Sequence, residues 1–203
     1  MTTNGETIAV LPEYIAEHLN APFKVVLLNS VRQIINKDGD VVKTIIPNPK
    51  GLLHQVAITR LLCPRKLGAT DIKFVRKALG IKAIELSDML SITPEHLSRC
   101  EAGERLLSPG LEKCLRLSVL LDTFKLPDGA EEACEGNDSL KDKLEKFRHA
   151  LRRVQDLIRM MPISSVYDSE EDLVFAFRIS KSTESDSADN EDEDWLDELS
   201  KAA

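Results

Sequence analysis

The signals that begin and end helices between residues 70 and 121 constrain the fold of this chain more than any other feature. Three good N-cap residues occur here, two of them followed by a proline that suits the first helical turn: Thr70, Thr93-Pro94 and Ser108-Pro109. Gly80 and Gly103 are the matching stop signals. The pattern predicts four short helices, at about residues 70–79, 83–90, 93–103 and 108–121. Because helices this short are stable only when packed together, residues 69–124 are expected to form one helical domain.

The apolar residues of the first two predicted helices follow helical spacing. The positions expected to face inward are Ile72, Val75 and Leu79 in the first helix, and Ile84, Leu86 and Leu90 in the second. A turn of three residues, 91–93, joins the second helix to the third. Two short helices joined by such a turn are typical of a helix-turn-helix motif, whose second helix enters the major groove of double-stranded DNA.

The helix at residues 94–102 is the candidate recognition helix, with Leu97, Cys100 and Glu101 facing inward. Arg99 is the candidate base reader, because a guanidinium group binds O6 and N7 of guanine with two hydrogen bonds. Ser98 and the helix N-terminus are expected to bind phosphate. The other candidate DNA contacts lie at outward or flanking positions: Pro94, Glu95, His96, Lys82, Arg105 and Lys113.

The stretch from Thr93 to Gly103 resembles the S-x-x-x-[IL]-S-R-W-E-x-G signature of lambda-repressor-like (Xre-type) helix-turn-helix proteins. The run from Leu67 to Gly80 is similar to the opening of the DNA-binding half of MqsA-type antitoxins. The resemblance covers about residues 40–124 and implies a DNA-binding fold. It also implies an ion pair between Arg76 and Glu101, which in that family joins the first helix to the third.

The chain departs from the family pattern at positions that bear on the target. The paired cysteines of the zinc domain found in MqsA-type antitoxins are missing, so no metal or cofactor is expected. Cys100 stands where the family has an aromatic residue, and Ala83 stands where it has a phosphate-binding glutamine. Glu95 replaces an asparagine that reads a base; a glutamate accepts from N4 of cytosine but repels phosphate. The expected result is a weaker affinity, a different target, or a motif that serves only protein partners.

Residues 1–68 are interpreted as a mixed α+β region. Its predicted elements are, in order, a helix, two strands and a second helix: residues 11–19, 23–35, 41–46 and 52–62. Pro12 suits the first turn of the first helix. Asp38-Gly39 lies between the two apolar runs and predicts a β-hairpin.

Residues 139–161 are predicted to form an amphipathic helix, with apolar residues at alternating spacings of four and three. These residues are Leu140, Leu144, Phe147, Leu151, Val154, Ile158 and Met161. Such a heptad seam fits either packing within one domain or dimerisation. The hypothesis preferred here is a homodimer formed through Leu144, Phe147, Leu151, Val154 and Ile158.

A strand is predicted at residues 172–180, because apolar residues alternate along it and share one face: Leu173, Phe175, Phe177 and Ile179. This strand is expected to pair with the N-terminal hairpin or with a partner subunit. Together with the amphipathic helix, it makes residues 139–180 a possible dimerisation region.

Residues 181–203 are predicted to be a disordered acidic tail, because the segment has too little apolar surface to fold alone. Trp195, Leu196 and Leu199 are an apolar exception within it. As a short helix they would dock on a protein partner, or fold back on the basic helices and compete with DNA. The alternative is an acidic tail that binds no partner and only increases solubility.

The formal net charge of −7 argues against a nucleic-acid partner only if the charge is evenly spread, and it is not. Residues 65–121 hold 10 Lys or Arg against 7 Asp or Glu, and residues 140–161 hold 7 against 3. The tail from residue 182 holds 1 against 9. The middle of the chain is therefore basic, as a DNA-binding domain requires.

Other function classes lack support in the sequence. The chain has four cysteines without a CxxC pair, no apolar run long enough for a membrane span, and no secretory leader, so a cytoplasmic protein is expected. No phosphate-binding loop, metalloprotease motif or nucleophile elbow is present, and no catalytic residue is proposed. The leading interpretation is a dimeric transcriptional regulator, preferably a repressor. The alternatives are an autoregulating antitoxin, and an adaptor or anti-activator that acts through the acidic tail.

Overall fold

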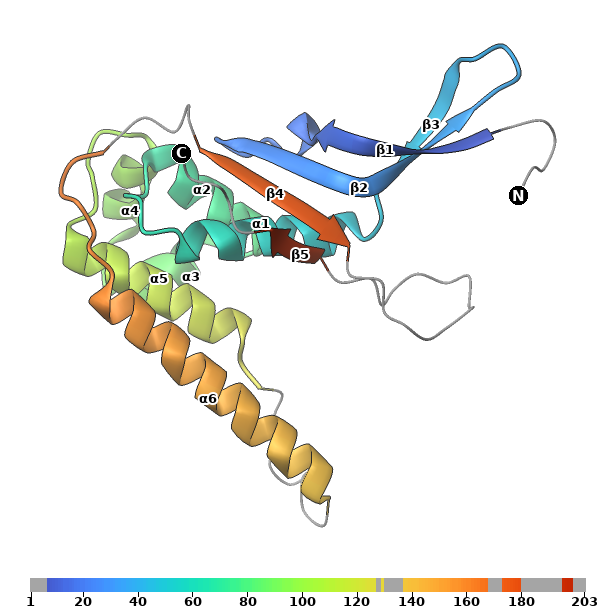
Figure 1. The fold of residues 1–203 in the computed structure, drawn as a ribbon. Helices are drawn as coiled ribbons and strands as arrows, with labels where there is room; N and C mark the ends of the chain where they lie inside the picture. Colours follow the sequence, from blue (N-terminus) through green and yellow to red (C-terminus); the bar gives the residue numbers. More distant parts are fainter. Residues whose placement is uncertain (1–6, 127–128, 130–136, 168–172, 180–194, 199–203) are drawn as a thin grey trace. The chain divides into compact units, whose positions relative to one another are not determined.

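The computed structural model of the chain describes residues 7–126, 129, 137–167, 173–179 and 195–198. The chain divides into two compact units (Figure 1). Unit 1 comprises Met1–Arg60 with Ser169–Ala203, and unit 2 comprises Leu61–Asp168. All five strands lie in unit 1, and the five helices from α2 to α6 lie in unit 2, so the predicted α+β class is confirmed for the described residues.

Unit 1 is built on a five-stranded mixed sheet with the order β1-β2-β4-β5, and with β3 paired to β2. The strands are β1 (Thr7–Ile15), β2 (Lys24–Ile35), β3 (Val41–Ile45), β4 (Val174–Ile179) and β5 (Trp195–Glu198). The β2–β4 pairing is parallel, and the other three pairings are antiparallel. The long strand β2 thus joins segments from both ends of the chain.

The predicted hairpin is present between β2 and β3. The side-chain Oδ1 of Asn36 accepts hydrogen bonds from the backbone N–H groups of Asp38 at 3.0 Å and Asp40 at 2.8 Å. Gly39 has a φ of +88°, which a residue with a side chain rarely adopts. These local contacts specify the turn, which is why the sequence predicted it.

The helix predicted at residues 11–19 is wrong. Residues 7–15 form strand β1, and only Glu17–Leu19 makes a single 3₁₀ turn. Strand β1 pairs with β2 from Val26 to Ile35, and these cross-strand contacts outweigh local helix propensity. Pro12 lies at a register shift between Leu11 and Glu13 in this edge strand, where its missing N–H is tolerated.

The core of unit 1 combines β2, β4 and helix α1 (Pro49–Leu62). Its fully or almost fully buried side chains include Val25, Leu27, Leu52, Val56, Ala57, Phe175 and Phe177. The rings of Phe23 and Phe175 meet edge to face, with centroids 5.0 Å apart. The predicted strand near the C-terminus therefore pairs with the N-terminal hairpin region, one of the two partners expected for it.

Part of the acidic tail is ordered, which corrects the prediction of a disordered segment. Residues 195–198 form β5 on the edge of β4, and Trp195 is buried, with 5% of its surface exposed. The indole Nε1–H donates to the carbonyl oxygens of Pro47 at 3.3 Å and Asn48 at 3.2 Å. The backbone hydrogen bonds to the edge of β4 and the burial of the indole stabilise this strand although the segment is mostly polar.

The burial of Trp195 removes the anchor proposed for a partner-binding tail. Leu199 and residues 180–194 lie outside the described residues, and of Leu196 only the backbone is described, in β5. The adaptor interpretation therefore loses its strongest side chain.

Unit 2 contains α2 (Ala69–Ala78), α3 (Ala83–Met89), α4 (Pro94–Glu101), α5 (Pro109–Thr123) and α6 (Asp138–Met160). Two predicted caps are confirmed: the hydroxyl of Thr93 accepts from His96 N–H at 3.2 Å, and that of Ser108 accepts from Leu111 N–H at 3.3 Å. The cap of α2 differs from the prediction. Gly68, not Thr70, is its N-cap residue, and its N–H donates to the Asp71 carboxylate at 2.9 Å.

The borders predicted at residue 68 and around residues 139–180 do not match the two units. Residues 61–68 belong to unit 2, and β4 belongs to unit 1 while α6 belongs to unit 2. The reason is that strand pairing joins β4 to β2, about 150 residues away in the chain. No helix among the described residues is long and apolar enough to cross a membrane.

Candidate nucleic-acid interface

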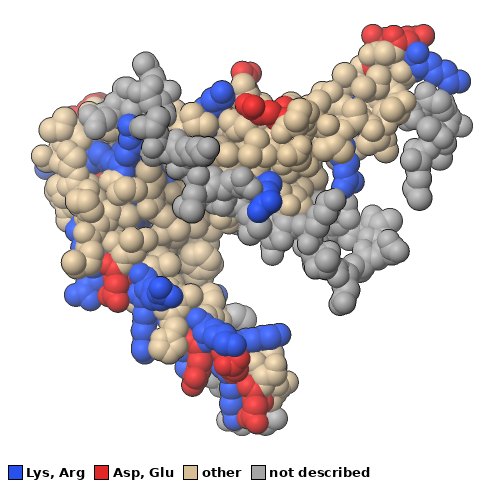
Figure 2. Space-filling view, in the orientation of Figure 1, with Lys and Arg blue, Asp and Glu red and all other residues tan. Residues whose placement is uncertain are grey.

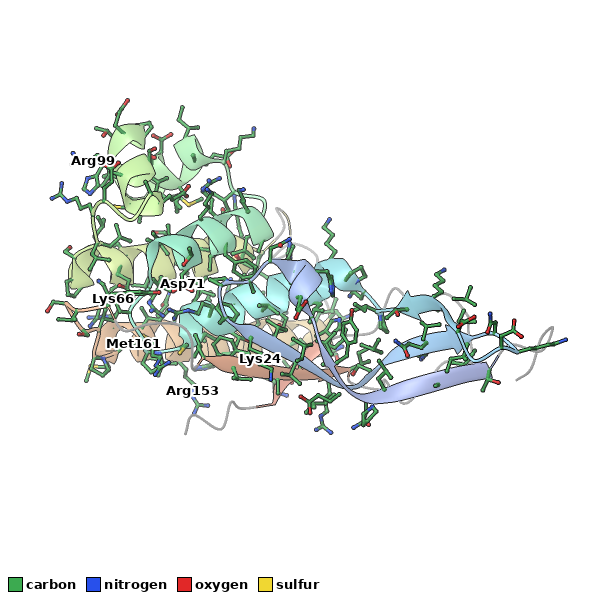
Figure 3. All side chains as sticks on the ribbon, turned by 90° about the horizontal axis from the view of Figure 1, so that it is seen from above. Lys24, Lys66, Asp71, Arg99, Arg153 and Met161 are labelled. Carbon is green, nitrogen blue, oxygen red and sulfur yellow. The ribbon has the colours of Figure 1, made fainter. Side chains whose placement is uncertain are left out.

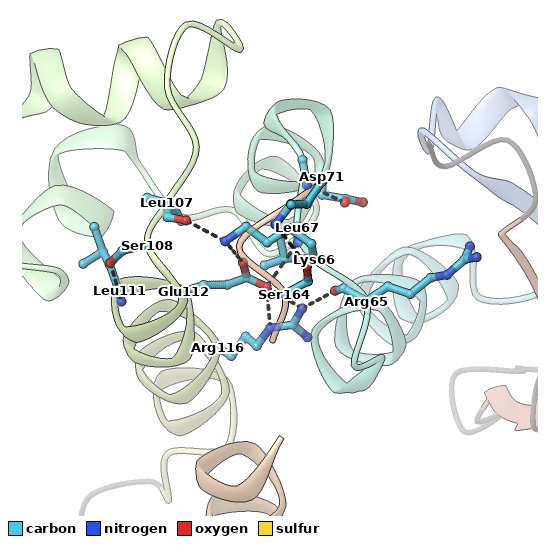
Figure 4. A network of polar contacts seen from close by, with 12 residues as sticks. Arg65, Lys66, Leu67, Asp71, Leu107, Ser108, Leu111, Glu112, Arg116 and Ser164 are labelled. Atoms are coloured by element: carbon cyan, nitrogen blue, oxygen red, sulfur yellow. Dashed lines mark hydrogen bonds and ion pairs between the residues drawn. The ribbon is translucent and has the colours of Figure 1, made fainter. Parts of the chain in front are cut away.

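A buried ionic cluster joins the segments of unit 2 that support the candidate interface. Glu112, in the first turn of α5, lies between two cations that are as buried as it is (Figure 4). Its Oε2 is 2.8 Å from Lys66 Nζ, and its Oε1 is 2.8 Å from Arg116 Nη2. Lys66 also donates to the carbonyl oxygen of Leu107 at 2.5 Å. The carboxylate therefore holds the segment before α2 and the loop before α5 together.

Arg116 extends this cluster to residues 61–65, the first segment of unit 2. Its guanidinium donates to the carbonyl oxygens of Leu61, Cys63 at 2.6 Å and Arg65 at 2.6 Å. A guanidinium with several N–H donors suits such a set of backbone acceptors. The spacing of Glu112 and Arg116 at i and i+4 was a signal for a helix ion pair. Their burial was not visible in the sequence, because the covering segments lie about 50 residues away.

A second ion pair ties α2 to α4. Arg76 Nε lies 2.6 Å from Glu101 Oε1, and Arg76 Nη2 lies 2.8 Å from Glu101 Oε2. The hydrogen bond to Glu101 raises the pKa of Arg76 against the opposing effect of burial. These two residues are the ones for which the Xre-type resemblance implied an ion pair, and the structure brings them together.

Helix α4 presents one polar face to solvent and packs its opposite face inward. Leu97 and Cys100 are buried, and burial raises the pKa of the Cys100 thiol. Four of the residues expected to face outward are exposed: Pro94, Glu95, Ser98 and Arg99. His96 is half-buried, as its marginal position predicted. Glu101 is also half-buried, as expected for an inward residue paired with Arg76.

Arg99 extends away from the helices of unit 2 (Figure 3), with 62% of its side chain exposed. Its Nε donates to Glu104 Oε2 at 3.2 Å. The sequence reasoning did not single out Glu104, which follows the stop signal at Gly103. The guanidinium is thus held at one nitrogen and accessible at the other two.

The three flanking cations differ in availability. Lys82 is highly exposed, with Nζ 3.7 Å from Glu85 Oε1, and Arg105 is exposed beside the end of α4. Lys113 is half-buried, and its ammonium donates to the carbonyl oxygen of Arg159 at 2.7 Å. Lys113 is therefore less suited to a phosphate contact than the sequence suggested, because it already interacts with the C-terminal end of α6.

Ile84 corrects the predicted inward face of α3. It is 60% exposed, whereas Leu86 and Leu90 are buried as expected. The buried neighbour of Leu86 is Ser87, whose hydroxyl donates to the carbonyl oxygen of Ala83 at 2.8 Å. Ile84 and Leu86 are two positions apart, about 200° around a helix, so both cannot face inward, whereas Leu86 and Leu90 are four apart and share one face.

Helix α6 packs against α5 chiefly near its C-terminal end, where Ile158 and Met161 are buried. The other seam residues, Leu144, Phe147, Leu151 and Val154, are half-exposed, and Leu140 is 40% exposed. Both basic and acidic side chains lie along the exposed surface of the helix (Figure 2). The seam thus serves packing within unit 2 at one end and faces solvent in part over the rest.

Comparison with family models, with curated proteins and with solved structures finds no match to the chain. The likeness to Xre-type proteins therefore stays a prediction. Among the described residues, no group of three His, Cys, Asp or Glu side chains is placed to hold a metal ion. The function is argued below from the geometry of unit 2.

Proposed function

We propose that the chain is a sequence-specific, DNA-binding transcriptional regulator that inserts α4 into the major groove. The observation that carries the proposal is the two-sided character of this helix. Leu97, Cys100 and the Arg76–Glu101 ion pair fix one side to the domain, and Ser98 and Arg99 occupy the exposed side. A single helix with a free polar face has the dimensions that the major groove of B-form DNA accepts.

The exposed residues have separate roles in this proposal. Arg99 reads guanine through two N–H donors, and Glu95 accepts from N4 of cytosine. Ser98, Lys82 and Arg105 contact the phosphate backbone, which adds affinity but little sequence information. Lys113 is left out of this set because its ammonium already donates to Arg159.

The proposed functional form is a homodimer that uses the half-exposed seam of α6. The seam residues Leu144, Phe147, Leu151 and Val154 form an apolar stripe on a helix of 23 residues. Two such apolar stripes, one from each copy of the chain, can bury each other in a coiled-coil contact. A helix face covered by charged residues could not be buried in this way. A dimer with two-fold symmetry recognises an inverted repeat whose half-sites lie about one helical turn, or a multiple of it, apart. Repression by occlusion is the preferred outcome.

The experiment is selection of a duplex from a randomised pool by the full-length chain, followed by fluorescence anisotropy at several salt concentrations. Arg99→Ala is expected to lose about 1–3 kcal/mol of binding free energy on the selected duplex and much less on a scrambled one. Lys82→Ala is the control, since loss of a phosphate contact weakens both duplexes alike. A failure to select any sequence would contradict the proposal.

A further inference from the structure

Arg99 and Glu104 are joined by two hydrogen bonds at the end of α4. The backbone N–H of Glu104 donates to the carbonyl oxygen of Arg99 at 3.0 Å. The side-chain Nε of Arg99 donates to Glu104 Oε2 at 3.2 Å. The first bond fixes the backbone position of Glu104 relative to Arg99. The second bond holds the guanidinium of Arg99 against the carboxylate of Glu104.

The backbone turn that makes this possible depends on Gly103. Its N–H donates to the carbonyl oxygen of Cys100 at 3.2 Å, which together with the bond from Glu104 completes a Schellman motif. Gly103 has a φ of +80°. A Cβ at this position would meet only Ala69 Cβ at 3.7 Å, an ordinary contact. Glycine is therefore favoured here by the backbone conformation and not by lack of space.

The contact to Glu104 restricts how Arg99 can donate hydrogen bonds. A guanidinium has five N–H donors in one plane, one of them on Nε. With Nε directed at Glu104, the two terminal nitrogens remain for an incoming ligand. Two N–H donors on these nitrogens can match the paired acceptors O6 and N7 of guanine.

The charge of Glu104 also acts on the alternative ligand of Arg99. A carboxylate beside the guanidinium repels a phosphate group, which carries a full negative charge, more strongly than the acceptor edge of a guanine, which carries only partial charges. Both side chains are largely exposed, at 62% and 60%, so DNA can reach them. The glutamate thus disfavours backbone contacts by Arg99 more than base contacts.

We propose that Glu104 is a positioning residue for Arg99, directing its terminal nitrogens to a guanine edge and away from phosphate. This inference rests on the proposed function, because it assigns a specificity role within the same interface. It makes the turn after α4, and not α4 alone, a determinant of sequence selectivity.

The test compares Glu104→Gln with the wild type on the selected duplex and on a scrambled duplex of the same composition. Removal of the carboxylate is expected to tighten binding to the scrambled duplex more than to the selected one. The selectivity ratio then falls by about two- to fivefold, the range typical of an exposed ion pair. Asp142→Asn is the matched control, because Asp142 forms a similar exposed pair with Lys146 on α6. That variant changes the net charge equally and leaves the ratio unchanged.

A double-variant measurement isolates the contact. In an Arg99→Ala background, Glu104→Gln is expected to have no further effect on the selectivity ratio, since the group it positions is gone. Nuclear magnetic resonance of the protein without DNA gives a second readout. The ¹⁵Nε and Hε resonances of Arg99 are expected to shift in Glu104→Gln and not in Asp142→Asn.

The outcomes separate this inference from the proposed function. If the wild type selects a sequence but Glu104→Gln keeps the wild-type ratio or leaves the Arg99 resonances in place, the positioning role is overturned and the proposed function stands. If the wild type selects no sequence, both fail together.

Discussion

Arg76 and Glu101, which lie 25 residues apart in the chain, meet through two hydrogen bonds of 2.6 and 2.8 Å. Each of their side chains is mostly buried, with 15% and 12% exposed. Because Arg76 lies on α2 and Glu101 ends α4, the pair sets the position of the candidate recognition helix on the domain.

Glu101→Ala is therefore expected to lower the free energy of unfolding by about 1.5–3 kcal/mol, since it leaves the Arg76 guanidinium without its main acceptor. Urea denaturation measures this change. Lys146→Ala removes an exposed pair and serves as the control, with an expected change of about 0–1 kcal/mol. Equal urea midpoints for the two variants would show that the buried pair stabilises the fold no more than the exposed pair does.

Cys100 makes the free energy of unfolding depend on pH. Burial raises the pKa of this thiol, and a smaller repulsion by Glu101 acts in the same direction against the attraction of Arg105 and Arg99. A raised pKa in the folded state means that the thiol stabilises the fold fully below the pKa of an unfolded cysteine. This contribution is lost as the pH rises through the folded value.

Stability measured by urea denaturation is thus expected to fall at alkaline pH, and less steeply in Cys100→Ala than in the wild type. With a maleimide at neutral pH, the exposed Cys114 reacts before the buried Cys100, which reacts only on unfolding. Rapid labelling of Cys100 in the folded protein would contradict its burial.

Trp195, the single tryptophan of the chain, is expected to emit as a buried indole and to resist quenching by acrylamide. Trp195→Ala should destabilise unit 1 by about 3–5 kcal/mol through lost apolar contact. Trp195→Phe keeps most of that contact and loses the bonds to Pro47 and Asn48, so it should cost only about 0.5–1.5 kcal/mol. Far-UV circular dichroism during urea denaturation follows both variants. Free quenching of the wild-type indole would place β5 in solvent.

The seam of α6 makes a prediction about assembly. Leu151→Glu, alone or with Val154→Glu, is expected to convert a dimer into a monomer in analytical ultracentrifugation, because a carboxylate cannot be buried unpaired in a coiled-coil contact. Met160→Glu is the control, since Met160 is 83% exposed and lies outside the seam. A wild type that sediments as a monomer would assign the seam to packing within unit 2 alone.

The elements predicted well from sequence are those whose signals lie within a few residues of the backbone they specify. Thr93 and Ser108 cap the helices they precede, and Asn36 and Gly39 close the hairpin. Their hydrogen bonds join residues two to four positions apart, so no distant segment is needed to form them. The exposed face of α4 follows equally directly from helical periodicity.

Other features depend on partners far away in the chain, and only the tertiary structure decided them. Residues 7–15 are a strand because β2 is available to pair with them, and Trp195 is buried because β4 and the carbonyl groups before α1 receive it. Glu112 and Arg116 are buried because the segment before α2 covers them. The local sequence determined where helices and turns begin and end. Burial and strand pairing were settled by three-dimensional contacts, because their free energy comes from groups that meet only after the chain has folded.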